Sequence, residues 1–329
     1  MNTRLNRSRF LKSLALGAAG LCAPQAGVRA FAGPGEDQGA PRTLIDTHTH
    51  FYDPSRPKGV PWPPASDKVL HRTVLPSHYR QLPKPRPVTG TVVVEASPWI
   101  EDNQWILDLA DKEPLIAGFV GNLSPGQAGF PTHLERFAAH SLFRGIRLRP
   151  APGRARWEDK KFVADLRLLV THDLSLDLVG GLEILELAGR LASTTPTLRI
   201  VIDHLAGVQI DGKAPPRAWI EALRALTEHA QVCFKVSGLV EGTGKRGGGA
   251  PTDTSFYRPV LDTLWDLFGE DRLIYGSNWP VCEHYASLET VQRLAQEYFA
   301  TKGAAVLDKV FALNARRAYR WVRRDPSNR

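Results

Sequence analysis

Two histidines separated by one residue carry the strongest chemical signal in the sequence. His48 and His50 lie in the segment 46–50 (DTHTH), which follows a short apolar run. Alternate residues of a β-strand point to the same side, so both imidazoles can face one site. Two imidazoles on one face can bind a divalent metal ion or stabilise an oxygen that gains negative charge. The spacing therefore predicts a metal site or a catalytic site at the end of a strand.

The elements that must position these histidines repeat along the 329 residues of the chain. Eight short runs of apolar and β-branched residues are predicted strands, at residues 43–47, 90–96, 115–121, 145–148, 174–178, 198–203, 232–237 and 272–276. Eight amphipathic segments are predicted helices, at residues 105–111, 132–139, 162–172, 181–193, 217–229, 259–268, 288–300 and 304–319. This alternation is typical of a parallel sheet, and eight units predict one (β/α)8 TIM barrel over residues 43–322.

Loops at the C-terminal ends of the strands form the working face of such a barrel. The proline-rich segments 54–64 and 76–87 are expected to be extended loops, and the first can contribute to a pocket rim. The glycine-rich segment 241–251 lacks the spacing of a phosphate-binding loop and is expected to be a lid or a surface loop. Lys235 is a candidate to bind substrate oxygens and Trp62 to form an apolar wall, with interior packing as the alternative for both.

The first 32 residues are typical of an export signal. A basic segment comes first, an apolar run follows at 13–23, and Ala30-Phe31-Ala32 fits a cleavage site. Residues 7–12 (RSRFLK) resemble a degenerate twin-arginine motif in which Ser8 replaces an arginine. We expect residues 33–42 to be a linker and residues 323–329 a tail. The expected location of the enzyme is periplasmic or extracellular.

Charge and hydropathy argue against two classes of partner. The chain has 42 Lys and Arg against 34 Asp and Glu, but five of the basic and none of the acidic residues lie within residues 1–32. The remaining excess of three positive charges, without a basic–aromatic motif, does not favour nucleic-acid binding. After residue 32 the sequence contains no apolar stretch of the roughly 20 residues that a membrane span needs. The expected partner is a small-molecule substrate.

Several segments resemble the amidohydrolase-related (amidohydrolase 2) family of the metal-dependent hydrolase superfamily. They are DTHTHFYDP at 46–54, FRGIR at 143–147, VIDHLAG at 201–207, RLIYGSNWPV at 272–281 and NARRAY at 314–319. Together they extend over residues 43 to 320, nearly all of the chain after the leader. The resemblance is to the lactonase branch, which includes 2-pyrone-4,6-dicarboxylate lactonase and sugar-acid lactonases. It implies a hydrolase that opens a small lactone or cyclic ester.

The resemblance also implies roles for single residues. His48 and His50 match the histidine pair of the family's first strand, and His204 matches the histidine of its D-H-L motif. These three histidines are the implied ligands of one divalent ion, zinc or manganese. A site without metal is the alternative, because residues 174–179 offer no histidine and some lactonase relatives work without one. Arg147 matches an arginine that holds a substrate carboxylate or a lactone oxygen.

Asn278 is the main departure from the family pattern. Most relatives have an aspartate at this position, which activates the attacking water. An amide cannot take a proton from water near neutral pH, although its oxygen can position one. Another carboxylate must therefore act as the base, and Glu95, at the end of the second predicted strand, is the first candidate. The other candidate bases are Asp53, Asp177, Asp203 and Glu283.

The predicted reaction is attack of water on a lactone carbonyl that the histidines polarise, with or without a metal. In this hypothesis Arg147 binds a carboxylate of the substrate and Asn278 positions the water. Two alternatives stay open. The first is a metal-dependent decarboxylase of the same family, which would release carbon dioxide. The second is a catalytically weak exported binding protein, which would keep the pocket without the base.

Overall fold

The computed structural model describes residues 43–149, 157 and 159–320. The predicted export signal (residues 1–32), linker (33–42) and tail (323–329) lie outside these residues and stay predictions. Among the described residues, no helix has both the length and the apolar character needed to cross a lipid bilayer.

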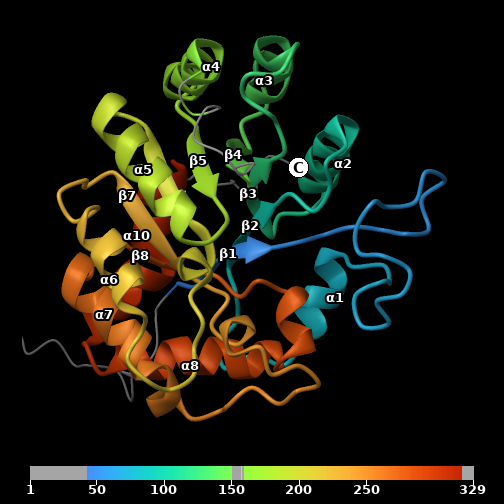
Figure 1. The fold of residues 1–329 in the computed structure, drawn as a ribbon. Coiled ribbons are helices and arrows are strands. Elements are labelled where there is room, and N and C mark those ends of the chain that lie inside the picture. Colours follow the sequence, from blue (N-terminus) through green and yellow to red (C-terminus); the bar gives the residue numbers. More distant parts are fainter. Residues whose placement is uncertain (1–42, 150–156, 158, 321–329) are drawn as a thin grey trace, which may run out of the picture. The chain divides into compact units, whose positions relative to one another are not determined.

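Eight parallel strands form a nearly closed barrel in the order of the sequence (Figure 1). They are β1 (Ile45–Thr49), β2 (Gly90–Val94), β3 (Ile116–Gly121), β4 (Phe143–Leu148), β5 (Ser175–Leu178), β6 (Arg199–Ile202), β7 (Val232–Val236) and β8 (Leu273–Tyr275). The first and last strands meet where the Thr47 hydroxyl donates to the Tyr275 carbonyl over 2.6 Å and Thr49 pairs with Trp279. The predicted TIM barrel is confirmed, and each predicted strand overlaps an observed one.

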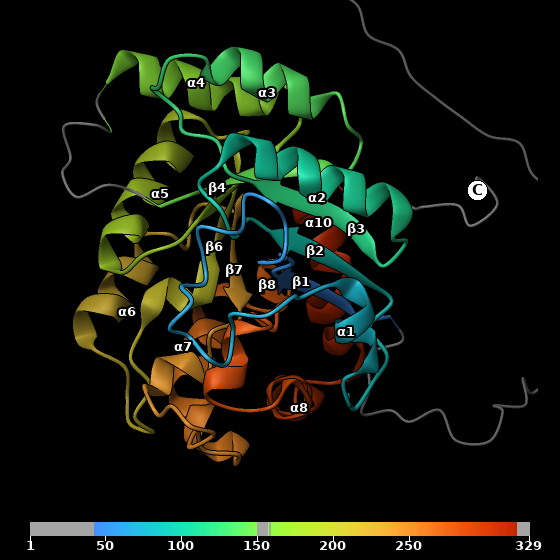
Figure 2. The same cartoon turned by 90° about the vertical axis from the view of Figure 1, so that its right-hand side faces the viewer.

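Helices surround the strands in both views (Figures 1 and 2). They are α1 (Pro76–Gln81), α2 (Ile100–Lys112), α3 (Phe130–Ala138), α4 (Lys160–Thr171), α5 (Leu182–Thr194), α6 (Arg217–Arg224), α7 (Arg258–Phe268), α8 (Leu288–Ala300), α9 (Ala304–Asp308) and α10 (Asn314–Tyr319). Shorter turns are η2 (Asp203–Gly207), η3 (Glu241–Thr243), η4 (Thr254–Tyr257), η5 (Val281–His284) and the π-helical η6 (Lys309–Leu313). The helix predicted at 304–319 is thus three consecutive helical pieces.

The prediction of an extended loop over 76–87 is wrong for its first half, which forms α1. Pro76 occupies the first helical turn, where the missing N–H costs no hydrogen bond and the fixed φ suits a helix. The Leu75 amide donates to the His78 ring over 3.1 Å and holds the start of the helix. The buried Tyr79 then reaches β1 and donates to Asp46 over 2.7 Å. Pro76 therefore begins a helix that helps to anchor β1.

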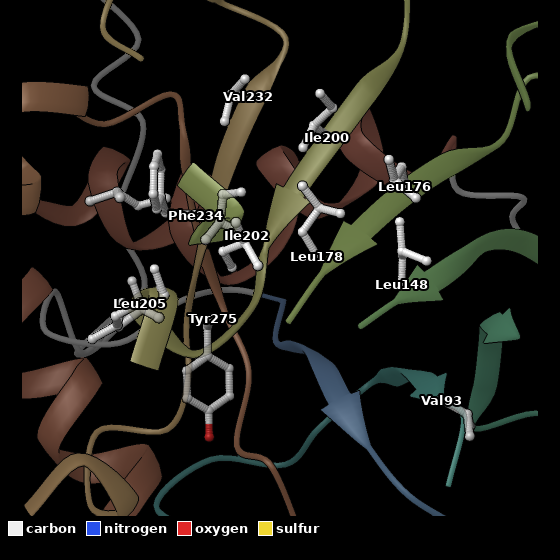
Figure 3. Packing of buried hydrophobic residues seen from close by; sticks show 14 of the residues in the cluster. Val93, Leu148, Leu176, Leu178, Ile200, Ile202, Leu205, Val232, Phe234 and Tyr275 are labelled. Carbon is white, nitrogen blue, oxygen red and sulfur yellow. The ribbon is translucent and has the colours of Figure 1, made fainter. Parts of the chain in front are cut away.

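The alternation of each strand divides the core into two apolar clusters. Leu176, Leu178, Ile200 and Ile202 belong to the outer cluster, between the strands and the helices (Figure 3). The inner cluster fills the barrel and includes residues of the last helical pieces. Its members are Ile45, Val92, Val94, Val120, Val201, Cys233, Ile274, Ala312, Ala315, Ala318 and Tyr319. Polar side chains thus remain for the C-terminal ends of the strands, where a barrel carries its chemistry.

Candidate active site

An irregularity in β1 turns His48 toward the barrel interior. Ile45 packs in the inner cluster, so strict alternation would place His48 on the opposite face. The register between β1 and β2 shifts between Asp46 and Thr49, and at this point the Asp46 carboxylate accepts the His48 amide over 3.1 Å. The rings of His48 and His50 then lie with centroids 5.0 Å apart. The predicted juxtaposition of the two histidines is confirmed.

A buried lysine supports His48 from below. The ammonium of Lys235, on β7, lies 2.8 Å from Asp177 Oδ2, 2.9 Å from Asp203 Oδ1 and 3.3 Å from His48 Nδ1. All four side chains are fully buried. Burial alone would lower the pKa of Lys235, but the two carboxylates outweigh it and raise that pKa. Lys235 is therefore an interior cation that forms ion pairs with two carboxylates beside the His48 ring.

The turn after β6 brings His204 beside His48. His204, Leu205 and Ala206 have φ values of 49°, 55° and 54°, a left-handed conformation that is costly for residues with a Cβ. The turn places the ring of His204 4.4 Å from that of His48, measured between centroids. Its Nδ1 lies 2.9 Å from the Ser237 hydroxyl. The backbone strain of this turn is tolerated because the turn positions His204 in the site.

A cavity of about 690 Å³ opens at this end of the barrel. Its wall includes most of the predicted site residues, drawn from loops that are far apart in the sequence. They are His50, Trp62, Glu95, Arg147, His204 and Asn278. Trp62 comes from the proline-rich loop after β1, and its ring centroid lies 5.8 Å from that of His50. Of the predicted substrate contacts, Lys235 lies in the interior beneath His48, so its contact with substrate stays a prediction.

Arg147 and Glu95 form an ion pair on the cavity wall. Arg147 Nε donates to Glu95 Oε1 over 2.7 Å, and Nη2 donates to the Glu95 carbonyl over the same distance. Arg147 is 9% exposed, and Glu95 is half-buried. Toward the described residues, Arg147 donates through Nε and Nη2 and not through Nη1. Glu95, the first candidate base, is thus also the counter-ion of the expected substrate anchor.

The other candidate bases lie elsewhere among the described residues. Asp177 and Asp203 belong to the buried cluster around Lys235. Burial alone would raise the pKa of Asp53, but hydrogen bonds from Ser55 and Thr73 in the loop after β1 together outweigh it and lower that pKa. Glu283 accepts from Arg72 and from the Trp279 indole. Neither Asp53 nor Glu283 belongs to the described wall of the cavity.

Asn278 links the histidines to a carboxyl group that sequence reasoning missed. Its Oδ1 lies 3.3 Å from His50 Nε2, and its Nδ2 donates to Glu241 Oε1 over 2.8 Å. Asn278 has a φ of 58°, in the left-handed region that asparagine tolerates better than most residues. Glu241 also lines the cavity. Its position in the loop after β7, at the face where a barrel carries its chemistry, was the available signal, but its glycine-rich surroundings suggested only a lid or a surface loop.

The three site imidazoles are neutral near pH 7. Burial lowers the pKa of His48 well below its usual value. Burial and then the Arg147 guanidinium lower the pKa of His50 to about 3. Burial lowers the pKa of His204 to about 4, although the Asp203 carboxylate acts in the opposite direction. Neutral imidazoles can donate to an oxyanion or ligate a metal ion, and their charge does not compete with a bound cation.

The described residues include one cluster suited to a divalent cation. Ligand atoms of His48, Asp203 and His204 lie within 4.8 Å of one another. His48 Nε2 and Asp203 Oδ2 are buried and have no hydrogen-bond partner among the described residues, as unfilled ligand positions would. Imidazole nitrogens with a carboxylate oxygen fit a divalent transition metal. The cluster contains Asp203 in place of His50, which had been predicted as the third ligand.

Comparisons with known proteins agree with this geometry. The sequence model of the family described as Amidohydrolase matches residues 45–321. The chain is 31% identical to an L-fucono-1,5-lactonase of Burkholderia ambifaria over 239 residues, which cover 72% of this chain and 80% of the relative. It is 30% identical to an L-fucono-1,5-lactonase of Burkholderia multivorans over 289 residues, covering 84% and 95%. An amidohydrolase from Burkholderia multivorans, solved with bound zinc, superposes with a TM-score of 0.73 at 27% identity, covering 85% and 100%.

Proposed function

The chain belongs to the amidohydrolase family and is a hydrolase, and from this premise we propose that it opens small lactones. The proposed substrates are 1,5-lactones of sugar acids and cyclic esters that carry a carboxylate. One observation supports this most strongly. Neutral His50 and His204, the ion-paired Arg147 and the amide of Asn278 converge on one cavity of about 690 Å³, which is within the range of small-molecule sites.

In the proposed reaction, the lactone carbonyl points toward the histidines. When no metal is bound, the N–H of neutral His204 would stabilise the oxyanion of the tetrahedral intermediate, because a donor held in a buried site needs no reorganisation during the reaction. A divalent ion held by His48, Asp203 and His204 would supply further Lewis-acid polarisation of that carbonyl, and we propose zinc on the basis of the zinc-bound relative. Lys235 maintains this arrangement by fixing Asp203 and His48 from the interior.

Arg147 is the proposed anchor for the negative end of the substrate. In this proposal Nη1 binds a carboxylate or a lactone oxygen of the substrate, while Nε and Nη2 keep their two bonds to Glu95. Trp62 covers the site edge-on to His50 and would shield the ring of the substrate. Asn278 orients the water through Oδ1, beside the lone pair of His50 Nε2.

Product analysis tests the proposal. The protein is incubated with sugar-acid 1,5-lactones and with carboxylated lactones in ¹⁸O-labelled water. The rate of ring opening should be well above the spontaneous rate. Attack at the carbonyl predicts one labelled oxygen in the product carboxylate and none in the released hydroxyl. Carbon dioxide release from aromatic hydroxy acids, without lactone opening, would instead indicate a decarboxylase. Thermal stabilisation by lactones without any product would indicate a binding protein.

A further inference from the structure

Glu241 lies at the cavity wall, and only one of its two carboxyl oxygens accepts a hydrogen bond from the described residues. Oε1 accepts the Asn278 amide over 2.8 Å. Oε2 is buried and has no hydrogen-bond partner among the described residues. A buried carboxyl oxygen without a donor is costly, so such a group usually serves a ligand or a proton. Burial raises the pKa of Glu241 to about 7, because the Asn278 bond offsets only part of the desolvation.

The backbone holds Glu241 firmly against the barrel, contrary to a mobile lid. The Ile210 amide donates to the Gly242 carbonyl over 2.8 Å, and the Gly242 amide donates to the Gly238 carbonyl over 2.9 Å. A Cβ on Gly242 would lie 2.9 Å from Ile210 Cγ1 and 3.0 Å from the Val208 carbonyl oxygen. Only glycine permits this approach, so the residue after Glu241 is fixed to the turn after β6.

Two acceptor atoms, His50 Nε2 and Asn278 Oδ1, lie side by side next to the Glu241 carboxyl. His50 Nδ1 lies 2.9 Å from the Val94 carbonyl and therefore carries the ring proton of the neutral imidazole. Its Nε2 is consequently an acceptor, although it faces another acceptor, Asn278 Oδ1, at 3.3 Å. A water molecule beside this pair can donate one proton to it and the other toward Glu241, whose carboxyl contacts the same amide.

We propose that Glu241 is the general base that takes the proton of the attacking water, a role that rests on the proposed lactone opening. As the water oxygen bonds to the carbonyl carbon, one water proton moves to Glu241 and the π electrons move to the carbonyl oxygen. When the intermediate collapses, the ring C–O bond breaks, and the proton on Glu241 passes to the departing alkoxide. The products are a hydroxyl group and a carboxylic acid, which loses its proton to solvent, so no co-reactant is needed.

The titratable groups that face Glu241 do not compete for this role. Burial and then the Glu241 charge raise the pKa of Tyr257, and burial and the same charge raise the pKa of the Cys282 thiol. Both groups therefore keep their protons near neutral pH. The rival carboxylate on the cavity wall, Glu95, is held by the guanidinium of Arg147. One carboxyl oxygen of Glu95 is therefore already engaged by a cation.

Steady-state kinetics of Glu241→Gln test the assignment on whichever lactone the wild-type protein opens. The glutamine keeps the size of the side chain and a partner for Asn278, but it cannot take a proton. We expect kcat to fall by about 100-fold or more, KM to change by less than about threefold, and the acidic limb near pH 7 to disappear. Glu297→Gln, the same change on α8 outside the cavity, is the control. The double variant Asn278→Asp with Glu241→Gln places the carboxylate at the other end of the same hydrogen bond. Its kcat should be at least about tenfold higher than that of Glu241→Gln alone.

Infrared difference spectra give a readout that does not depend on lactone opening. A protonated carboxyl band that titrates near pH 7 should be present in wild-type protein and absent in Glu241→Gln. The proposal is overturned if that band is missing, if Glu241→Gln keeps kcat within about threefold, or if Glu95→Gln rather than Glu241→Gln removes the acidic limb. If wild-type protein opens no lactone while the band titrates as expected, the proposed function fails and the proton-accepting role of Glu241 does not.

Discussion

Asn278 donates a hydrogen bond to Glu241 over 2.8 Å, so an amide from the end of β8 and a carboxyl from the turn after β7 act as one pair. The amide cannot titrate near neutral pH, whereas the carboxyl titrates close to it. The pair therefore carries one negative charge or none. Asn278 Oδ1 also lies 3.3 Å from His50 Nε2, so the pair adjoins the position proposed for the attacking water.

Asn278→Asp should change the pH dependence of kcat/KM in a defined direction. Two carboxyls 2.8 Å apart share one proton, which stabilises the singly charged form and separates the two apparent pKa values. One carboxylate is then available below pH 7, so the acidic limb should move down by about one unit or more, and a second limb should appear at high pH. Rates measured from pH 4.5 to 10 check this. An acidic limb that stays near pH 7 would count against a functional pair.

Glu241→Gln should stabilise the folded protein at alkaline pH more than at acidic pH. The pKa of Glu241 is about 7 in the folded state and 4.5 as its ordinary value, so the folded state binds the proton more tightly. Wild-type stability is therefore lost as pH rises from about 4.5 to about 7, by at most about 3 kcal/mol from this group. Urea unfolding of both proteins at pH 5 and pH 8 measures the difference. An equal difference at both pH values would contradict the burial of the charge.

Lys235→Met should destabilise the protein strongly. The substitution leaves the carboxylates of Asp177 and Asp203 buried without their shared cation, a loss of about 3–5 kcal/mol in unfolding free energy. Lys213→Met is the control, because Lys213 and Asp211 form an exposed ion pair and its loss should cost less than about 1 kcal/mol. Urea denaturation of the three proteins gives both values. Equal losses for the two variants would mean that the interior ion cluster contributes no more to the unfolding free energy than an exposed ion pair.

Arg147→Met should discriminate between charged and neutral lactones. If Arg147 binds a substrate carboxylate through Nη1, kcat/KM for a carboxylated lactone should fall by about 100-fold, which corresponds to about 2.7 kcal/mol. A neutral lactone of the same ring size should lose less than about tenfold. Rates on both substrates, measured under subsaturating conditions, provide the comparison. Equal losses would assign Arg147 to the lactone oxygen or to the positioning of Glu95.

Zinc should stabilise the folded protein through His48, Asp203 and His204. At a free concentration 100 times the dissociation constant, the unfolding free energy should rise by about 2.7 kcal/mol. His204→Ala should abolish this gain, whereas His133→Ala, on α3, should retain it. Thermal unfolding with and without zinc, after treatment with a chelator, measures the effect. A gain that persists in His204→Ala would place the metal elsewhere.

The fold could be predicted from sequence because the hydrophobic pattern is strong. Each run of β-branched residues forms one strand, and residues such as Leu176 and Leu178 pack outward while Asp177 between them faces the interior. The short helix α1 was missed because a proline in the first helical turn resembles a proline in a loop. Short elements lack the periodicity that identifies longer ones.

The site could be predicted only where a local pattern carried it. The spacing of His48 and His50 identified the histidine pair, although the irregular register of β1 that orients them was not visible. Glu241 contacts Asn278 across 37 positions, through a left-handed residue and a close glycine approach. Such contacts depend on the closed barrel, so no periodicity or motif in the sequence indicates them.

The most direct measurement is the rate of proton release from a sugar-acid 1,5-lactone at pH 7, compared with the rate without protein. Folded, zinc-supplemented wild-type protein should accelerate opening by many orders of magnitude, and His50→Asn should lower kcat/KM by at least about 100-fold. A panel of neutral and carboxylated lactones opened no faster than in buffer would contradict lactone hydrolysis at this cavity.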